Sequence, residues 1–126
     1  MIKKEGPGWR IIRDPSRDNF STLIGGENWA IELNKFEWEN LVKLVIDLSD
    51  QYKSVREQLM VDEDITLELE RSPWLAILKG DQNGWNLRLI LSASGLLNRG
   101  AEVYWSRNVT NFVSDAMRIM WDSDYL

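Results

Sequence analysis

The amino-acid sequence predicts an α+β fold in which an antiparallel sheet followed by a helix occurs twice, in the order βββα–ββββα. In each half a strand-like segment leads into a capping residue and then into an amphipathic segment. These segments are 27–33, Asn34 and 35–60 in the first half, and 101–105, Ser106 and about 109–121 in the second. Short turn signals separate the other strand-like segments, as in antiparallel hairpins. With 126 residues, we expect a single domain, 1–126, made of two similar halves, about 1–60 and 61–126.

The first half contains three predicted strands. Residues 9–14 form the first, and a proline-containing turn ends it. One face of this strand carries Trp9, Ile11 and Arg13. Residues 20–24 and 28–33 form a predicted hairpin around the glycine pair at 25–26, which we expect to supply the positive φ angles of a tight turn.

Residues 35–60 form the most clearly predicted helix. Asn34 can cap its first turn, and Glu37 completes a capping-box pattern. Apolar residues recur at intervals of three and four, at Trp38, Leu41, Val45, Leu48, Tyr52, Val55 and Leu59. Because strand signals flank the segment on both sides, we expect the helix to lie across a sheet. The same spacing would also fit a helix–helix seam of the coiled-coil type.

The second half contains four predicted strands, at residues 65–70, 74–79, 85–92 and 101–105. A turn at 81–84, which ends in Asn-Gly, joins the second strand to the third, and a loop around Gly95 precedes the fourth. The closing helix covers about 109–121. We expect the core to include Trp38, Leu41, Val45, Leu48, Ile65, Leu67, Leu69, Leu87, Leu89, Phe112, Val113 and Met117.

The composition argues against catalysis. The chain has no cysteine and no histidine, so it lacks a thiol nucleophile, the common zinc ligands and the side chain that most often transfers protons near neutral pH. The acidic run at 62–64 lacks the glycine and terminal glutamate of a calcium-binding loop. We therefore expect no enzyme activity, no metal and no cofactor. The N-terminus has no apolar signal segment, which favours a cytoplasmic chain outside the membrane.

The charge is unevenly distributed along the chain. Residues 1–19 contain five basic and three acidic side chains, so this segment carries a charge of +2. The remaining residues carry −7, which gives the total charge of −5. The most concentrated acidic residues are Asp62, Glu63, Asp64, Glu68 and Glu70. This acidity argues against tight, non-specific binding to duplex nucleic acid, which depends on neutralising phosphates.

Tryptophans next to arginines nevertheless suggest a site for single-stranded nucleic acid. In such sites aromatic rings stack on bases while arginines meet phosphates. The candidate residues are Trp9, Arg10, Arg13 and Arg88. The more common role of a strand tryptophan is to fill the core between sheet and helix, and Trp85 shares the predicted buried face of its strand. The hypothesis requires the three arginines to converge on one exposed sheet face.

The alternative hypothesis is a protein-interaction module. In it, the acidic strand around Glu68 and Glu70 binds a basic protein partner, or the sheet or long helix forms a homodimer. A catalytic pair of Glu32 and Glu102, on strands one repeat apart, is disfavoured because no motif surrounds either residue.

Residues 22–33, together with Gly8-Trp9-Arg10 and Glu37, resemble the signature of a small uncharacterised family from cyanobacteria. Members of that family are similar in fold to the single-stranded-DNA-binding transcriptional regulators, of which the plant Whirly proteins are the best known. The resemblance implies a duplicated ββββα unit, with the missing first-half strand at residues 1–4 or from a split at Pro15. It also implies, by analogy, binding of single-stranded nucleic acid in transcription. The Lys-Gly-Lys-Ala strand motif of Whirly proteins has no match in this chain.

Overall fold

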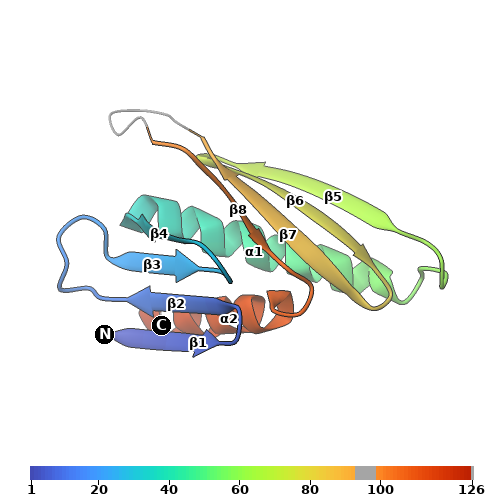
Figure 1. Cartoon of the computed structure of the whole chain (residues 1–126), viewed down its shortest axis with the longest axis horizontal. Helices are drawn as coiled ribbons and strands as arrows, with labels where there is room; N and C mark the ends of the chain where they lie inside the picture. The colour runs from blue at the N-terminus through green and yellow to red at the C-terminus, as the bar shows by residue number, and fades with distance from the viewer. Residues whose placement is uncertain (93–98, 126) are drawn as a thin grey trace.

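The computed structural model describes residues 1–92 and 99–125, so the loop predicted around Gly95 lies mostly outside the described residues. Two antiparallel four-stranded sheets are each followed by a helix, which confirms the α+β prediction (Figure 1). Sheet A has the order β1(Ile2–Gly6), β2(Trp9–Arg13), β3(Thr22–Gly25), β4(Ala30–Leu33), and α1(Lys35–Arg56) follows it. Sheet B has the order β5(Ile65–Arg71), β6(Trp74–Asp81), β7(Gly84–Leu91), β8(Ala101–Trp105), and α2(Thr110–Tyr125) follows it.

The first half contains one strand more than the three predicted from the residue pattern. This strand is β1, which overlaps the segment 1–4 and pairs antiparallel with β2. The two-residue turn between them consists of Pro7 and Gly8, and Gly8 adopts a φ of 82°. Because β1 lies at a sheet edge and is mostly polar, its sequence carries little of the apolar alternation that marks a strand.

The glycine pair at 25–26 does not form the turn of the β3–β4 hairpin, so that prediction is wrong. Gly25 is the last residue of β3, and the Gly26 amide donates a hydrogen bond to the Trp29 carbonyl (2.9 Å). Glu27 and Asn28 therefore form the turn. Gly26 is required for its lack of a side chain, because the indole of Trp29 lies across it.

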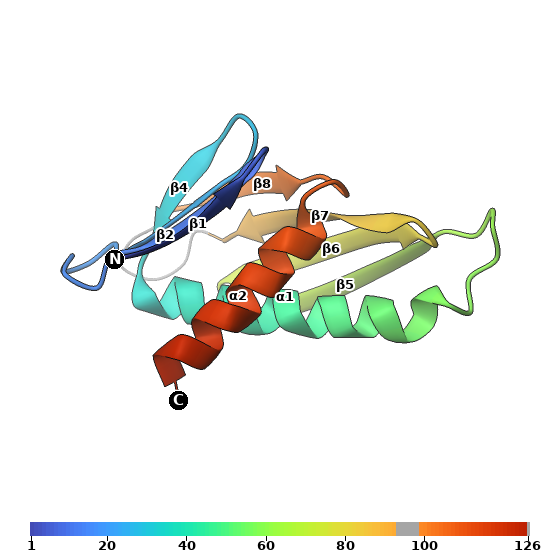
Figure 2. The same cartoon turned by 90° about the horizontal axis from the view of Figure 1, so that it is seen from below.

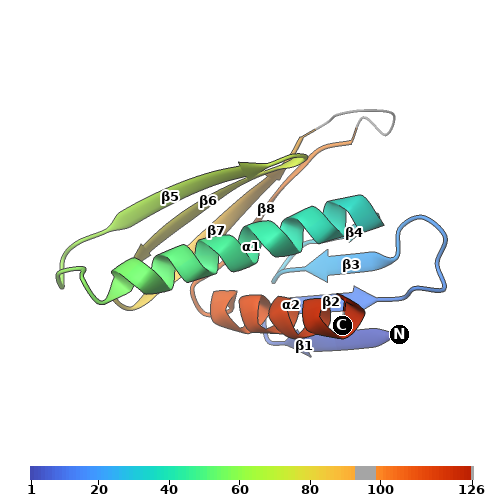
Figure 3. The same cartoon turned by 180° about the vertical axis from the view of Figure 1, so that it is seen from behind.

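The two helices lie on the same side of the two sheets, and α2 crosses α1 (Figure 2). We call the sheet faces toward the helices the inner faces and the opposite ones the outer faces. Helix α1 packs mainly against β5 and β6 and touches β4, while α2 packs against β2 and β7 (Figure 3). The prediction of a long helix across a sheet is therefore confirmed, although α1 ends at Arg56 and not at residue 60. No helix in the described part of the chain is both long and apolar enough to cross a membrane.

The capping box of α1 forms as predicted. The Glu37 amide donates to Asn34 Oδ1 (2.8 Å), and the Asn34 amide donates to Glu37 Oε1 (2.9 Å). These bonds satisfy donors that the first helical turn leaves unpaired. The Glu37 carboxylate also lies 3.7 Å from Arg99, which precedes β8. The start of α1 is thus fixed by its own sequence and by the second half of the chain.

Most of the predicted core residues are buried or packed against the core, and one is not. Ile65, Leu67 and Leu69 are partly buried on the inner face of β5. Phe112 was predicted to be buried but is 60% exposed. Its ring stacks on Trp9, with ring centroids 6.5 Å apart and an angle of 5° between the planes. The interior position beside it on α2 is taken by Val113.

Two tryptophans join sheet A to sheet B. Trp29 Nε1 donates to the Tyr104 carbonyl on β8 (2.9 Å), and Trp105 Nε1 donates to the Gly25 carbonyl on β3 (2.9 Å). The two indole rings lie 5.3 Å apart. Each sheet thus donates one indole hydrogen bond to a backbone carbonyl of the other, which fixes the ends of the two sheets against each other.

Candidate functional site

The structure does not bring together the three arginines predicted to bind nucleic acid. Arg13 lies on the inner face of sheet A, where its Nε donates to Thr22 Oγ1 (3.2 Å) and its guanidinium lies 5.3 Å from the Trp38 ring. Arg10 lies on the outer face, because neighbouring residues of a strand point to opposite faces. Arg88 lies on the outer face of the other sheet, sheet B. The three guanidinium groups therefore face three different environments.

Arg88, on the outer face of sheet B, and Arg17, in the turn after β2, each form an ion pair with a glutamate. Arg88 Nε lies 2.5 Å from Glu102 Oε1, and Arg17 Nη1 lies 3.0 Å from Glu32 Oε1. Both acids of the disfavoured catalytic pair are thus ion-paired on different sheets. This arrangement fits solvated surface charges better than a shared acid–base centre.

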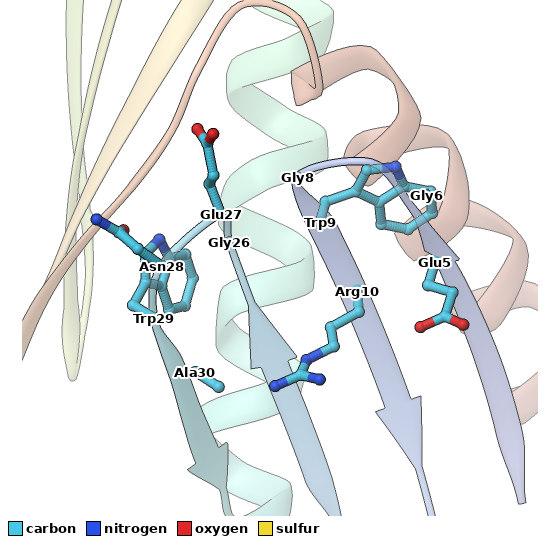
Figure 4. A pocket seen from close by; sticks show the side chains of 10 residues that line it. All are labelled: Glu5, Gly6, Gly8, Trp9, Arg10, Gly26, Glu27, Asn28, Trp29 and Ala30. Carbon is cyan, nitrogen blue, oxygen red and sulfur yellow. The ribbon is translucent and has the colours of Figure 1, made fainter.

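Trp9 and Arg10, two of the four predicted residues, line one hollow at the end of sheet A. This hollow, which we call the hairpin-end groove, has a volume of about 500 Å³ and is open to solvent (Figure 4). The tips of the β1–β2 and β3–β4 hairpins form it. Its lining residues are Glu5, Gly6, Gly8, Trp9, Arg10, Gly26, Glu27, Asn28, Trp29 and Ala30.

The same four-residue pattern, Gly-x-x-Trp, builds both hairpin tips. Gly6 pairs with Trp9, and Gly26 pairs with Trp29. A β-carbon on Gly6 would lie 2.7 Å from Trp9 Nε1, and one on Gly26 would overlap the Trp29 ring. In each hairpin the glycine therefore leaves space for the indole on the opposite strand. This repeated spacing is a signal in the sequence that could have indicated both hairpin tips.

The groove continues toward the loop between β8 and α2. A neighbouring hollow of about 440 Å³ shares four residues with it, and it adds Tyr104, Ser106 and Asn108 from the second half of the chain. The shared residues are Gly8, Glu27, Asn28 and Trp29. Because Trp29 is hydrogen-bonded to β8, its ring is held in place where the two hollows meet.

The hairpin-end groove is lined by more negative than positive charge. Glu5 and Glu27 supply two carboxylates, and Arg10 supplies one guanidinium. Glu5 is partly compensated by Lys3 at 3.2 Å, whereas Glu27 has no ion-pair partner among the described residues. Within 1–92 and 99–125, no cluster of acidic side chains could hold a metal ion. The groove can thus offer aromatic surface, hydrogen bonds and a carboxylate to a ligand.

Comparison with known proteins gives a family and a solved structure. The family model described as "Domain of unknown function (DUF1818)" matches residues 4–120. A crystal structure of a protein with unknown function, described as being from the DUF155 family, from Prochlorococcus sp. NATL2A, is 79% identical in sequence. The match covers 96% of this chain and 99% of that chain, with a TM-score of 0.92. The comparison with curated proteins finds no match.

Proposed function

This chain belongs to the DUF1818 family of unknown function, and we propose that it is a non-catalytic protein-interaction module whose hairpin-end groove receives a basic segment of a partner protein. The supporting observation is the lining of the groove. The partly exposed indole of Trp29 and the unpaired carboxylate of Glu27 line it from one hairpin, and Trp9, whose ring stacks on Phe112 of α2, lines it from the other. Aromatic residues are enriched in protein interfaces, and hairpin tips on a rigid sheet are common places for binding residues.

The charge distribution favours a protein partner over nucleic acid. A single strand with phosphates in the groove would approach Glu5 and Glu27, and Arg10 is the groove's one guanidinium. Arg13 and Arg88 lie elsewhere. The resemblance to Whirly transcriptional regulators keeps single-stranded nucleic acid as the competing hypothesis. Its test is therefore part of the same experiment.

A non-catalytic role is supported by the chemistry of the groove. Its side chains include no histidine or cysteine, and its two acids come from different hairpins. Groups of this kind recognise a ligand through charge and hydrogen bonds, whereas general acid–base catalysis needs a positioned proton donor and acceptor around one reacting atom.

The proposal is tested with the full chain as bait in a cyanobacterial lysate, in parallel with a labelled single-stranded oligonucleotide at about 50 mM salt. We expect a protein partner that is captured by the native chain and lost with Glu27→Arg, which reverses the groove's unpaired charge. Asp115→Arg makes the same charge change on the exposed face of α2 and should leave capture intact.

Two outcomes would contradict the proposal. One is capture that Glu27→Arg leaves unchanged. The other is oligonucleotide binding without a protein partner, with an affinity that falls with log salt at a slope of about −0.7 per phosphate contacted.

A further inference from the structure

The two sheets have four edge strands, and their backbones are not equally available. The edges of β4 and β8 receive hydrogen bonds from side chains: the Glu32 carbonyl accepts from Arg99, and the Tyr104 carbonyl accepts from Trp29. The edges of β1 and β5 receive none from the described residues, and they lie on opposite sides of the molecule (Figure 1). These two strands are therefore the open edges of the fold.

The outward backbone groups of β5 follow from its register. Arg71 and Trp74 close a two-residue hairpin, so they exchange backbone hydrogen bonds. Because such pairs alternate along an antiparallel ladder, Leu69, Leu67 and Ile65 also bond to β6. The residues between them direct their N–H and C=O groups away from β6, toward solvent. They are Thr66, Glu68 and Glu70.

Strand β5 lacks the lysine, proline and bulge that protect many exposed edges, and the charges on its outer face are the acidic Glu68 and Glu70. Natural edge strands are commonly blocked by lysine, proline or a bulge. Strand β1 has Lys4 on its inner face, whereas β5 has no lysine or proline and pairs with β6 without interruption over 7 residues. The inner-face side chains of β5 are also only partly buried, so a neighbouring strand would cover them further.

We propose that the β5 edge accepts an extended strand of a partner protein in which lysine or arginine alternates with aliphatic residues. The backbone of that strand would bond to Thr66, Glu68 and Glu70, its basic side chains would meet the glutamates, and its aliphatic side chains would extend the inner face. Glu68 and Glu70 form no ion pair with described residues, and Asp62, Glu63 and Asp64 add negative charge before the strand. This surface lies outside the hairpin-end groove, and the inference does not depend on the groove's function.

A second copy of this chain fits the edge poorly. Antiparallel pairing of two β5 strands about Glu68 would place the two Glu68 carboxylates directly opposite each other. Like charges in that position destabilise a sheet. The charge of the edge therefore favours a foreign, basic strand.

The test uses fluorescence polarisation with the full chain and a labelled peptide of alternating lysine and valine, of the same length as β5, 7 residues. The matched peptide of alternating glutamate and valine should not bind. In the chain, Glu68→Pro removes an outward N–H without removing a bond to β6, which edge strands tolerate. We expect Glu68→Pro to weaken binding of the basic peptide about tenfold relative to Glu68→Val, which has lost the same charge but keeps the N–H.

The inference would be overturned by no binding of the basic peptide, by equal binding of Glu68→Pro and Glu68→Val, or by a native dimer in size-exclusion chromatography that Glu68→Pro dissociates. A circular-dichroism melt checks that both variants are folded. Peptide binding that is lost with Glu27→Arg but kept with Glu68→Pro would also reject the edge while supporting the groove. Peptide binding that is lost with Glu68→Pro but kept with Glu27→Arg supports the edge. That result does not bear on the groove, whose proposed function is tested by the capture experiment.

Discussion

At the scale of single residues, Trp29, Trp74, Trp85 and Trp105 each donate the indole N–H to an element distant in sequence. Trp74 Nε1 donates to the Glu37 carbonyl (2.9 Å), and Trp85 Nε1 donates to Asn111 Oδ1 (3.0 Å). Both side chains are buried, and each bond joins a strand of sheet B to a helix. The strand period predicted that Trp85 faces the core. The partners of these indoles could not be predicted, because they lie on elements distant in sequence.

Tyr52 leads to a prediction about stability at alkaline pH. Its hydroxyl donates to the Asp81 carbonyl (2.5 Å), and desolvation by burial raises its pKa above the usual value. The folded state therefore favours the neutral phenol. This contribution to stability is fully present below the unfolded-state pKa of about 10 and is lost as the pH rises through the higher folded-state pKa.

We expect Tyr52→Phe to lower the free energy of unfolding at neutral pH by about 1 kcal/mol, because it deletes the hydrogen bond. Its free energy of unfolding should also decline less than that of the native chain above a pH of about 10. Urea denaturation at a series of pH values measures both effects. Tyr104→Phe, at a side chain that is 49% exposed, serves as the control and should keep the native decline. Parallel curves for Tyr52→Phe and the native chain would contradict the assigned role.

At the scale of elements, the sequence predicted those whose signals are local. The capping box placed the start of α1 at residue 35, and the period-two pattern placed β8 at residues 101–105. It did not predict β1 from its own residues, because a polar edge strand has no continuous apolar face. The glycine pair at 25–26 suggested the wrong residues for the turn of the β3–β4 hairpin, because Gly26 makes space for the Trp29 indole and does not supply a positive φ.

The hairpin tips yield the prediction for this scale. Gly26→Ala should lower the free energy of unfolding by about 1–3 kcal/mol, because the added methyl group overlaps the Trp29 ring and disturbs its bond to β8. In a Trp29→Ala background the same substitution should cost much less, because the ring is gone. A double-mutant cycle by urea denaturation measures this coupling. Equal costs in the two backgrounds would show that the glycine is needed for another reason.

At the scale of the whole molecule, local sequence patterns do not determine how the two sheets are placed relative to each other. Strand parity indicates that Arg10 and Arg13 point to opposite faces, but it cannot relate Arg88 on sheet B to either of them. That relation depends on the crossing of α1 and α2 and on the indole bonds between the sheets. The hairpin-end groove has the same origin, because its second part combines loops from both halves of the chain. A site of this kind could not be predicted from local patterns.

The packing of the helices predicts that the two halves fold only together. Helix α1, from the first half, covers β5 and β6 of sheet B, and α2, from the second half, packs against β2 of sheet A. Separated, each half would expose the apolar inner face of its sheet, so fragments 1–61 and 62–126 should each be unfolded alone. Mixing them should restore the circular-dichroism spectrum and a cooperative melt. Insertion of a flexible linker in the exposed turn at 61–64 of the intact chain should leave the fold in place. A cooperative melt of fragment 62–126 by itself would show instead that the second half is an independent domain.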